Sequence, residues 1–458
     1  MCASTKDAIY PDGPRGIPFL GNLPEIRQNP LRFLEACGRD YGDVTRLRLA
    51  YYDGYLVNSP ELIHRILVDE VNHFTRFAGH KSTRLSRILN GGAGMDRVAQ
   101  FPMDGDFWLR ERWLVQPALT PTKVVQYGDT MVRHAQKMMD RWKKGEVRDI
   151  YKDMVSIAYS VISETMFNAR EDDDLETLHK AFEIIIDRIA TQLGTLAPVP
   201  GVLPTNANRA LRWSLNTIEQ AFTRLVEKHH TGEYPDDLIS RMIHTNDGKD
   251  RTQDREWRFQ VFSLLAAGYE TSAVVLTWIW YLLAQNPDVR QMVQVELQNV
   301  LNGRPPKAED IPRLKKTRAV FDETLRLYPP AWCFSPLIVR EDCVIAPYKF
   351  RKGTIILLSP WVTHRDPRHF EFADRFYPQR WDEENAVSVN KHAFFPFGRG
   401  PRHCVGSSFA TTEVMLTVAT IAQSFDLELA SPGSIVLPKP HVSLRPGQPV
   451  MMQIRHRA

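Results

Sequence analysis

Apolar side chains recur every three or four residues through most of the chain between residues 107 and 298. This spacing places them on one face of a helix and predicts a succession of amphipathic helices. The longest such pattern covers residues 255–285 and ends before Pro287, because the residue before a proline is disfavoured in a helix. Further helices are predicted at residues 318–327 and from about 406 to 425.

Strand-like and irregular segments lie outside these helices. Short apolar runs predict β-strands at residues 44–49, 54–57, 343–345 and 354–358. Proline and glycine crowd residues 10–23, which predicts an extended lead-in, and residues 370–397 are predicted to be mostly irregular. We find no internal repeat and no linker that splits the chain. We therefore expect a single, mainly α domain over residues 1–458, with small β elements.

The composition is that of an ordinary globular protein. Hydrophobic residues make up 43% of the 458 residues and charged residues 24%. The formal net charge is +4 and no long block of Lys and Arg is present, which argues against a nucleic-acid partner. The five cysteines are widely spaced, which argues against a disulfide framework or a zinc site and favours a reducing compartment.

Nothing in the sequence predicts insertion into a membrane. The first residues contain no apolar run, so no signal peptide or anchor is predicted. Residues 261–284 form the most membrane-like stretch, but Gly268, Glu270 and Thr271 interrupt it, and a charge within lipid is costly. We expect a buried helix there. The absence of an anchor suggests a cytoplasmic protein, which we expect to be a monomer.

The segment from Phe397 to Gly406 carries the most specific chemical signal in the chain. Two glycines and a proline precede Cys404, which predicts a tight turn whose backbone can approach another group closely. A helix is predicted to begin just after Cys404, and the free N–H groups at its start would favour a thiolate, as would the charge of Arg402. The alternative is a buried structural cysteine on a glycine-rich turn.

The whole pattern, Phe-x-x-Gly-x-Arg-x-Cys-x-Gly, resembles the cysteine loop of cytochrome P-450 enzymes, and its fixed positions are Phe397, Gly400, Arg402, Cys404 and Gly406. The resemblance implies a haem b group whose iron is bound by the sulfur of Cys404, with Phe397 and Arg402 beside the haem. A thiolate ligand favours cleavage of the O–O bond of bound oxygen. The resemblance also implies the P-450 fold, a large helical bundle around haem with small β-sheets near the N-terminus and the C-terminus.

Glu323 and Arg326 match the Glu-x-x-Arg motif of the same family. Residues three apart share a helix face, so the two side chains can pair, although such a pair alone is usually a solvated surface pair. Arg380 supplies the second arginine that completes a buried network in the family. The resemblance implies that this structural network braces the cysteine loop.

Residues in the middle of the predicted long helix look like the oxygen-binding groove of the family. Gly268 would let a ligand approach the helix backbone, and the Thr271 hydroxyl can open the local hydrogen-bond ladder. The resemblance places Ala267 against the haem and makes Glu270 and Thr271 an acid–alcohol pair that relays protons to bound oxygen. The alternative is a tolerated mid-helix glycine beside a surface glutamate.

Trp108 and Arg112 fit the Trp-x-x-x-Arg helix of the family. Positions four apart face the same way on a helix, so both side chains could donate hydrogen bonds to the haem propionates, as the resemblance implies. The alternative is a core tryptophan with a surface arginine.

The resemblance implies a monooxygenase that activates O2 and most simply hydroxylates a hydrophobic small molecule, and it suggests secondary metabolism. The chain contains no flavin-binding or NADPH-binding sequence, so electrons are expected from NAD(P)H through a separate ferredoxin and ferredoxin reductase. Basic residues in or beside the haem motifs are candidates for docking an acidic electron donor: Arg110, Arg112, Lys391, Arg399, Arg402 and His403.

Family analogy places the substrate pocket at apolar and aromatic residues of separate segments, namely Leu89, Phe101, Leu265, Trp332, Phe334 and Val442. Such a lining fits a terpenoid-like or aromatic molecule, and a fatty acid is an alternative. Oxidative ring closure or coupling also remains open. The presence of both Glu270 and Thr271 argues against peroxide-driven chemistry and against a non-catalytic haem protein.

Overall fold

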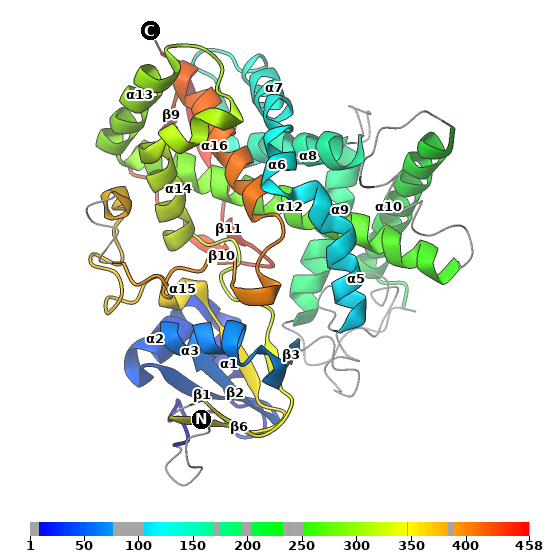
Figure 1. Ribbon diagram of the computed structural model, residues 1–458, viewed down its shortest axis with the longest axis vertical. Coiled ribbons are helices and arrows are strands. Elements are labelled where there is room, and N and C mark those ends of the chain that lie inside the picture. Colours follow the sequence, from blue (N-terminus) through cyan, green and yellow to red (C-terminus); the bar gives the residue numbers. More distant parts are fainter. Residues whose placement is uncertain are drawn as a thin grey trace. The chain divides into compact units, whose positions relative to one another are not determined.

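The computed structural model in Figure 1 describes residues 9–76, 105–168, 175–193, 203–231, 238, 251–345, 347–382 and 389–457. The predicted pocket residues Leu89 and Phe101 lie outside these ranges. The chain divides into two compact units, and each unit combines segments far apart in the sequence. The described residues of 9–76 and 325–404 form the first unit, and those of 105–324 and 405–457 form the second.

The first unit is built on a five-stranded sheet with the strand order β1-β2-β8-β5-β3. Strand β2 pairs with β8 in parallel, and the other neighbours pair antiparallel. The strands are β1 (Val44–Leu49), β2 (Tyr52–Val57), β3 (Phe74–Arg76), β5 (Leu337–Val339) and β8 (Ile355–Leu358), and a separate hairpin joins β6 (Cys343–Ile345) to β7 (Tyr348–Phe350).

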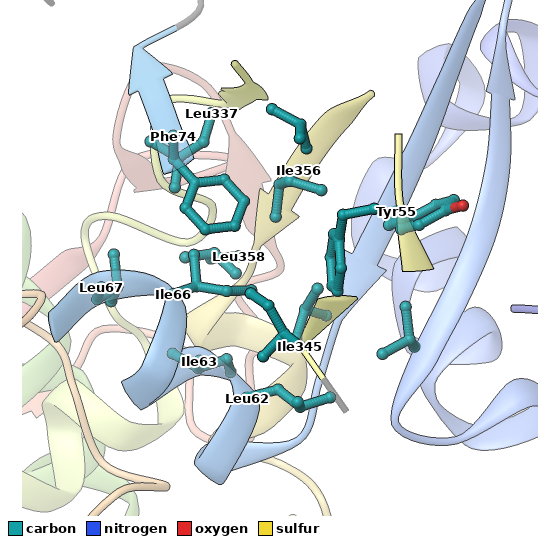
Figure 2. Packing of buried hydrophobic residues seen from close by; sticks show 14 of the residues in the cluster. Tyr55, Leu62, Ile63, Ile66, Leu67, Phe74, Leu337, Ile345, Ile356 and Leu358 are labelled. Atoms are coloured by element: carbon teal, nitrogen blue, oxygen red, sulfur yellow. The ribbon is translucent and has the colours of Figure 1, made fainter. Parts of the chain in front are cut away.

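Short helices accompany this sheet. They are α1 (Leu23–Gln28), α2 (Pro30–Tyr41), α3 (Pro60–His64), the π-helical turn η1 (Arg65–Asp69) and α15 (Pro360–Thr363). Figure 2 shows how the core forms: Ile63 of α3 and Ile66 of η1 point toward Phe74 and Leu358 of the sheet. Burial of these side chains is the main force that holds the unit together.

The second unit is mainly helical. Helix α12 (Arg251–Gln285) packs on α8 (Ile150–Phe167) and α16 (Ser407–Ser424), and α7 (Gly128–Met139) packs on both α8 and α16. Helix α9 (Leu175–Leu193) packs on α10 (Asn206–Thr231). The remaining helices are α5 (Asp106–Val115), α6 (Pro121–Val125), α13 (Pro287–Leu301) and α14 (Lys315–Leu327), the last of which ends in the first unit.

Two small sheets complete the second unit near the end of the chain. Strand β12 (Met451–His456) lies between β4 (Val147–Asp149) and β9 (Phe425–Leu429), with antiparallel pairing on both sides. Strands β10 (Pro438–Pro440) and β11 (Leu444–Pro446) form a hairpin that contacts α12 through β11.

Most of the predicted elements are confirmed. The helices predicted at 255–285, 318–327 and 406–425 are α12, α14 and α16, and the four predicted strands are β1, β2, β6 and β8. Residues 370–397 are irregular where described, apart from a short turn at Pro378–Trp381. The sequence analysis missed helices α1 to α3. Asn29 caps the start of α2, where its side chain accepts a hydrogen bond from the Arg32 N–H at 3.1 Å.

Candidate active site

The cysteine loop belongs to the first unit and turns tightly. Gly400 has a φ of 67°, and a Cβ atom there would lie 2.1 Å from the backbone oxygen of Leu67, so only glycine fits. The loop closes where the N–H of Cys404 donates to the carbonyl oxygen of Phe397 at 2.9 Å. Phe397 and Cys404, two of the three residues of this loop predicted to contact haem, are therefore held side by side.

The sulfur of Cys404 differs from the other cysteine sulfurs in its exposure. Of the four cysteines in the described residues, Cys404 alone is exposed. Burial raises the pKa of Cys37 and of Cys333 to about 12, and burial with nearby carboxylates raises that of Cys343 to about 11. Those three side chains stay protonated thiols at neutral pH, and a protonated thiol is a poor metal ligand. Among the described cysteines, Cys404 is therefore the one whose exposure would let it bind an external metal.

A buried histidine connects the cysteine loop to the rest of the first unit. The Nε2 atom of His364 accepts a hydrogen bond from the N–H of Phe395 at 3.1 Å, and the N–H of Gly398 donates to the carbonyl oxygen of Phe395 at 2.9 Å. Burial, and then the positive charge of Arg326, hold the pKa of His364 well below its usual range. The ring is therefore neutral and able to accept. Sequence reasoning missed His364 because a lone histidine carries no motif.

The two predicted arginines bind the backbone of one irregular segment. The fully buried Arg326 donates to three carbonyl oxygens between residues 364 and 375, at 2.6 to 2.9 Å. Arg380 donates to the carbonyl oxygens of residues 371 and 372, at 2.7 and 3.3 Å. Glu323 is also fully buried on α14. These are buried structural residues, and the surface-pair alternative does not describe them.

The middle of α12 presents small side chains on one face. Ala267 is exposed and Thr271 is partly exposed, and the Thr271 hydroxyl donates to the carbonyl oxygen of Ala267 at 2.7 Å. A Cβ atom on Gly268 would lie 2.0 Å from the side chain of Ile162 on α8. The close approach that Gly268 permits is thus to a neighbouring helix, a use that the sequence analysis did not anticipate.

Glu270 faces a different set of groups from its neighbour Thr271. Its carboxylate is almost fully buried, at 3% exposure. It forms a two-pronged ion pair with Arg445 of β11, with the Nη2–Oε2 distance at 2.8 Å. The hydroxyl of Ser443 donates to it at 2.5 Å, and that of Tyr151 on α8 lies at 3.4 Å. The sequence analysis missed all three partners, which no motif marks, and Glu270 is not the surface glutamate of the alternative reading.

Trp108 and Arg112 lie together on α5, as their spacing predicts. The guanidinium carbon of Arg112 is 5.7 Å from the centroid of the Trp108 ring. Both side chains are partly exposed. An indole N–H and a guanidinium on one partly exposed helix face could both donate to carboxylates.

The described residues predicted for the substrate pocket differ in exposure. Leu265 is buried on α12, and Val442 is 48% exposed beside β11. Trp332 and Phe334 are partly exposed. The ring of Phe334 packs edge-on against Phe395, with centroids 5.7 Å apart, and so lies next to the residue that supports the cysteine loop.

The chemistry of these groups fits haem. An exposed thiol on a rigid loop can bind iron, and the partly exposed Phe397 and Arg402 of the same loop offer an apolar ring and a cation. Haem needs both, because its ring is apolar and its propionates are anionic. Trp108 and Arg112 offer two further donors for propionates.

The model of the family named Cytochrome P450 matches residues 11–453, nearly the whole chain. The chain belongs to the cytochrome P450 family. A P450 uses haem iron and O2, and the expected P450 fold, mainly helical with small β-sheets, is confirmed.

Curated P450 relatives cover almost the full length of the chain. Cyclooctatin synthase of Streptomyces melanosporofaciens is 31% identical over 449 residues, which are 97% of this chain and 95% of that protein. Cyclooctat-9-en-7-ol 5-monooxygenase of the same species is 30% identical, over 90% of this chain and 88% of that protein. Pentalenene oxygenase of Streptomyces avermitilis is 29% identical, over 89% of each chain. The chain is accordingly a P450 monooxygenase.

No helix in the described ranges is both long and apolar enough to span a bilayer. In particular, α12, which contains the most membrane-like stretch of the sequence, is a helix of the second unit that packs on α8 and α16. The expectation of a buried helix at this position is confirmed.

Proposed function

We propose that this P450 inserts one oxygen atom into a C–H bond of a terpenoid-like hydrocarbon skeleton. The names of two relatives specify an oxygenase of pentalenene and a monooxygenase of cyclooctat-9-en-7-ol, an alkene and an alkenol. The candidate pocket residues Leu265, Trp332, Phe334 and Val442 supply only apolar and aromatic surface, apart from the indole N–H. Such a lining favours a hydrocarbon over a charged fatty acid, whose carboxylate would need a polar partner.

The exposed sulfur of Cys404 is the observation that carries this proposal. We propose that it binds the iron of haem b, with Phe397 and Ala267 against the haem and with Trp108, Arg112 and Arg402 donating to the propionates. The haem supplies the chemistry of oxygen activation when bound. Arg326 and Arg380 hold the irregular segment that follows His364, and His364 in turn supports the cysteine loop. We propose that Glu323 completes this structural network.

The protein's own part in the reaction is to deliver protons and electrons. We propose that Glu270 and Thr271 of α12 relay the protons. The Thr271 hydroxyl gives its hydrogen to the carbonyl of Ala267, so its oxygen keeps lone pairs that can accept a proton donor on the exposed face of α12. Electrons would come from NAD(P)H through a ferredoxin and its reductase, because the sequence contains no flavin-binding or NADPH-binding motif.

Three experiments test this function. The reduced protein with carbon monoxide should show the strongly red-shifted absorption band of thiolate-bound haem, and Cys404→Ser should lose it while the matched Cys343→Ser variant keeps it. A ligand screen should then show polycyclic alkenes, but not fatty acids, shifting the ferric haem band as water leaves the iron. Incubation with labelled O2, ferredoxin and reductase should add one labelled oxygen atom. Products formed without oxygen gain would favour oxidative coupling instead.

A further inference from the structure

Arg445 links three elements of the second unit, namely β11, α9 and α12. It is on β11, its side chain is 12% exposed, and it binds carboxylates from two different helices. One edge of the guanidinium, formed by Nε and Nη2, holds Glu270 of α12. On the other side, Nη1 lies 2.9 Å from the carboxylate of Glu183 on α9. One cation is therefore shared between the proposed proton relay and a helix that plays no part in it.

The two carboxylates do not hold Arg445 equally. Glu270 accepts two aligned hydrogen bonds and is buried, whereas Glu183 is about one-third exposed and makes only a charge contact, without hydrogen-bond alignment. Two-pronged pairs between arginine and carboxylate are strong because both N–H groups are aligned. The negative charge of Glu183 nevertheless repels that of Glu270 across the shared cation, and this repulsion makes the bound position of Glu270 less favourable.

A carboxylate held in this way is a poor proton carrier. The oxygens of Glu270 are occupied by Arg445, by Ser443 and, at longer range, by Tyr151. To pass a proton toward Thr271, the Glu270 side chain must leave this clamp, and the cost of leaving it depends on how firmly Arg445 holds it.

We propose that Arg445 is a positioning residue that couples helix α9 to the proton relay, because Glu183 and Glu270 compete for its guanidinium. This inference rests on the proposed relay through Glu270. When α9 holds Arg445 through Glu183, Glu270 is freer to move. When that contact is lost, Glu270 is clamped and proton delivery slows. Helix α9 thus influences the rate of proton delivery although it contributes no residue to the proposed relay.

The variant Glu183→Gln tests the coupling, because it removes the competing charge and keeps the side-chain shape. We expect the fraction of electrons recovered in product to fall about two- to fivefold, the range for losing one partly exposed ion pair. The solvent deuterium isotope effect on product formation should rise, because proton delivery would limit the rate. A purely structural loss would change substrate affinity or stability and leave the isotope effect alone.

The chain offers a matched control one helical turn away. Asp187 of α9 pairs with His441 of the same hairpin at 3.1 Å, so its removal deletes a carboxylate of α9 but leaves the ion pairs of Arg445 with Glu183 and Glu270 in place. Asp187→Asn should leave both the product yield per electron and the isotope effect unchanged. In an Arg445→Lys background, which loses the two-pronged grip, Glu183→Gln should have no further effect on either quantity.

The outcomes separate the inference from the function beneath it. Equal behaviour of Glu183→Gln and Asp187→Asn would overturn the coupling through Arg445. If Glu270→Gln has a defective product yield but Glu183→Gln does not, the relay stands and only the inference fails. If Glu270→Gln gives product as efficiently as the natural protein, the relay itself fails, and the inference fails with it.

Discussion

Two buried glutamates on neighbouring helices differ in whether a cation compensates the charge of the carboxylate. Glu270 of α12 has its charge compensated by Arg445, whereas no group in the described residues hydrogen-bonds either carboxyl oxygen of Glu413 on α16. Glu413 is fully buried, and burial raises its pKa to about 8 although the nearby Ser272 hydroxyl opposes the shift. A buried carboxyl group without a partner avoids the cost of its charge by keeping its proton.

Glu413 should therefore make stability depend on pH. Its folded pKa of about 8 lies above the value of 4.5 for an unperturbed glutamate, so the folded protein binds the proton more tightly. The contribution of Glu413 to the free energy of unfolding should be greatest below pH 4.5. It should fall as the pH rises toward 8, by up to about 1.4 kcal/mol per pH unit. Urea unfolding of Glu413→Gln should lack this decline. Glu428→Gln, on the partly exposed end of β9, should retain it, and an unchanged slope in Glu413→Gln would contradict the assignment.

Substitution of Gly400 tests how closely the cysteine loop packs against the backbone of Leu67. Alanine there would suffer a positive φ, at a cost of about 1–2 kcal/mol, and a clash with the backbone of Leu67 as well. Gly353 provides the control, because its φ is 84° but no atom lies within 4 Å of an added Cβ. We expect Gly400→Ala to lose most of the thiolate-type carbon monoxide band, and Gly353→Ala to keep it with only a small loss of stability. Equal spectra would show that the loop can shift without disturbing the thiolate.

At the scale of elements, the contact between α12 and α8 depends on Gly268. Alanine would gain about 1 kcal/mol of helix propensity but would press on the Cδ1 atom of Ile162, and overpacking costs about 1–3 kcal/mol. Gly268→Ala should thus lower the urea midpoint slightly. In an Ile162→Val background, which lacks that atom, the same change should raise the midpoint. A double-mutant cycle of these two substitutions measures their coupling in the free energy of unfolding. If the two effects on stability are additive, α12 and α8 can move apart to accommodate the added methyl group.

The sequence predicted the elements whose signals are local. Helix α12 and strand β1 follow from side-chain periodicity, and the cysteine loop follows from a motif within ten residues. Arg445 could not be predicted as the partner of Glu270, because 175 residues separate them and only folding brings β11 to α12. His364 could not be predicted either, because its role depends on a hydrogen bond from the backbone amide of Phe395, which is distant in the sequence. Motifs identify the candidate reacting groups, but the residues that position these groups become visible only in the folded structure.

At the scale of the whole molecule, the basic residues near the haem motifs differ in how accessible they are to a partner. Arg399 is committed to its own loop, where it donates to the carbonyl oxygens of Lys391 and Phe394. Lys391 and Arg110 are exposed. Since the net charge of +4 is small, attraction of an acidic electron donor would depend on such local charges rather than on the protein as a whole.

Reduction by an acidic ferredoxin should therefore be steered by single exposed cations. We expect the second-order rate of the first electron transfer to fall at least about tenfold between low and high salt, because ions screen the attraction. Lys391→Glu should lower the low-salt rate and flatten this dependence. Lys352→Glu reverses the same charge on an exposed turn outside the haem motifs and should change neither. If Lys391→Glu and Lys352→Glu change the rate equally, only the net charge of the protein steers the partner. A rate that does not depend on salt would exclude a charged docking surface altogether.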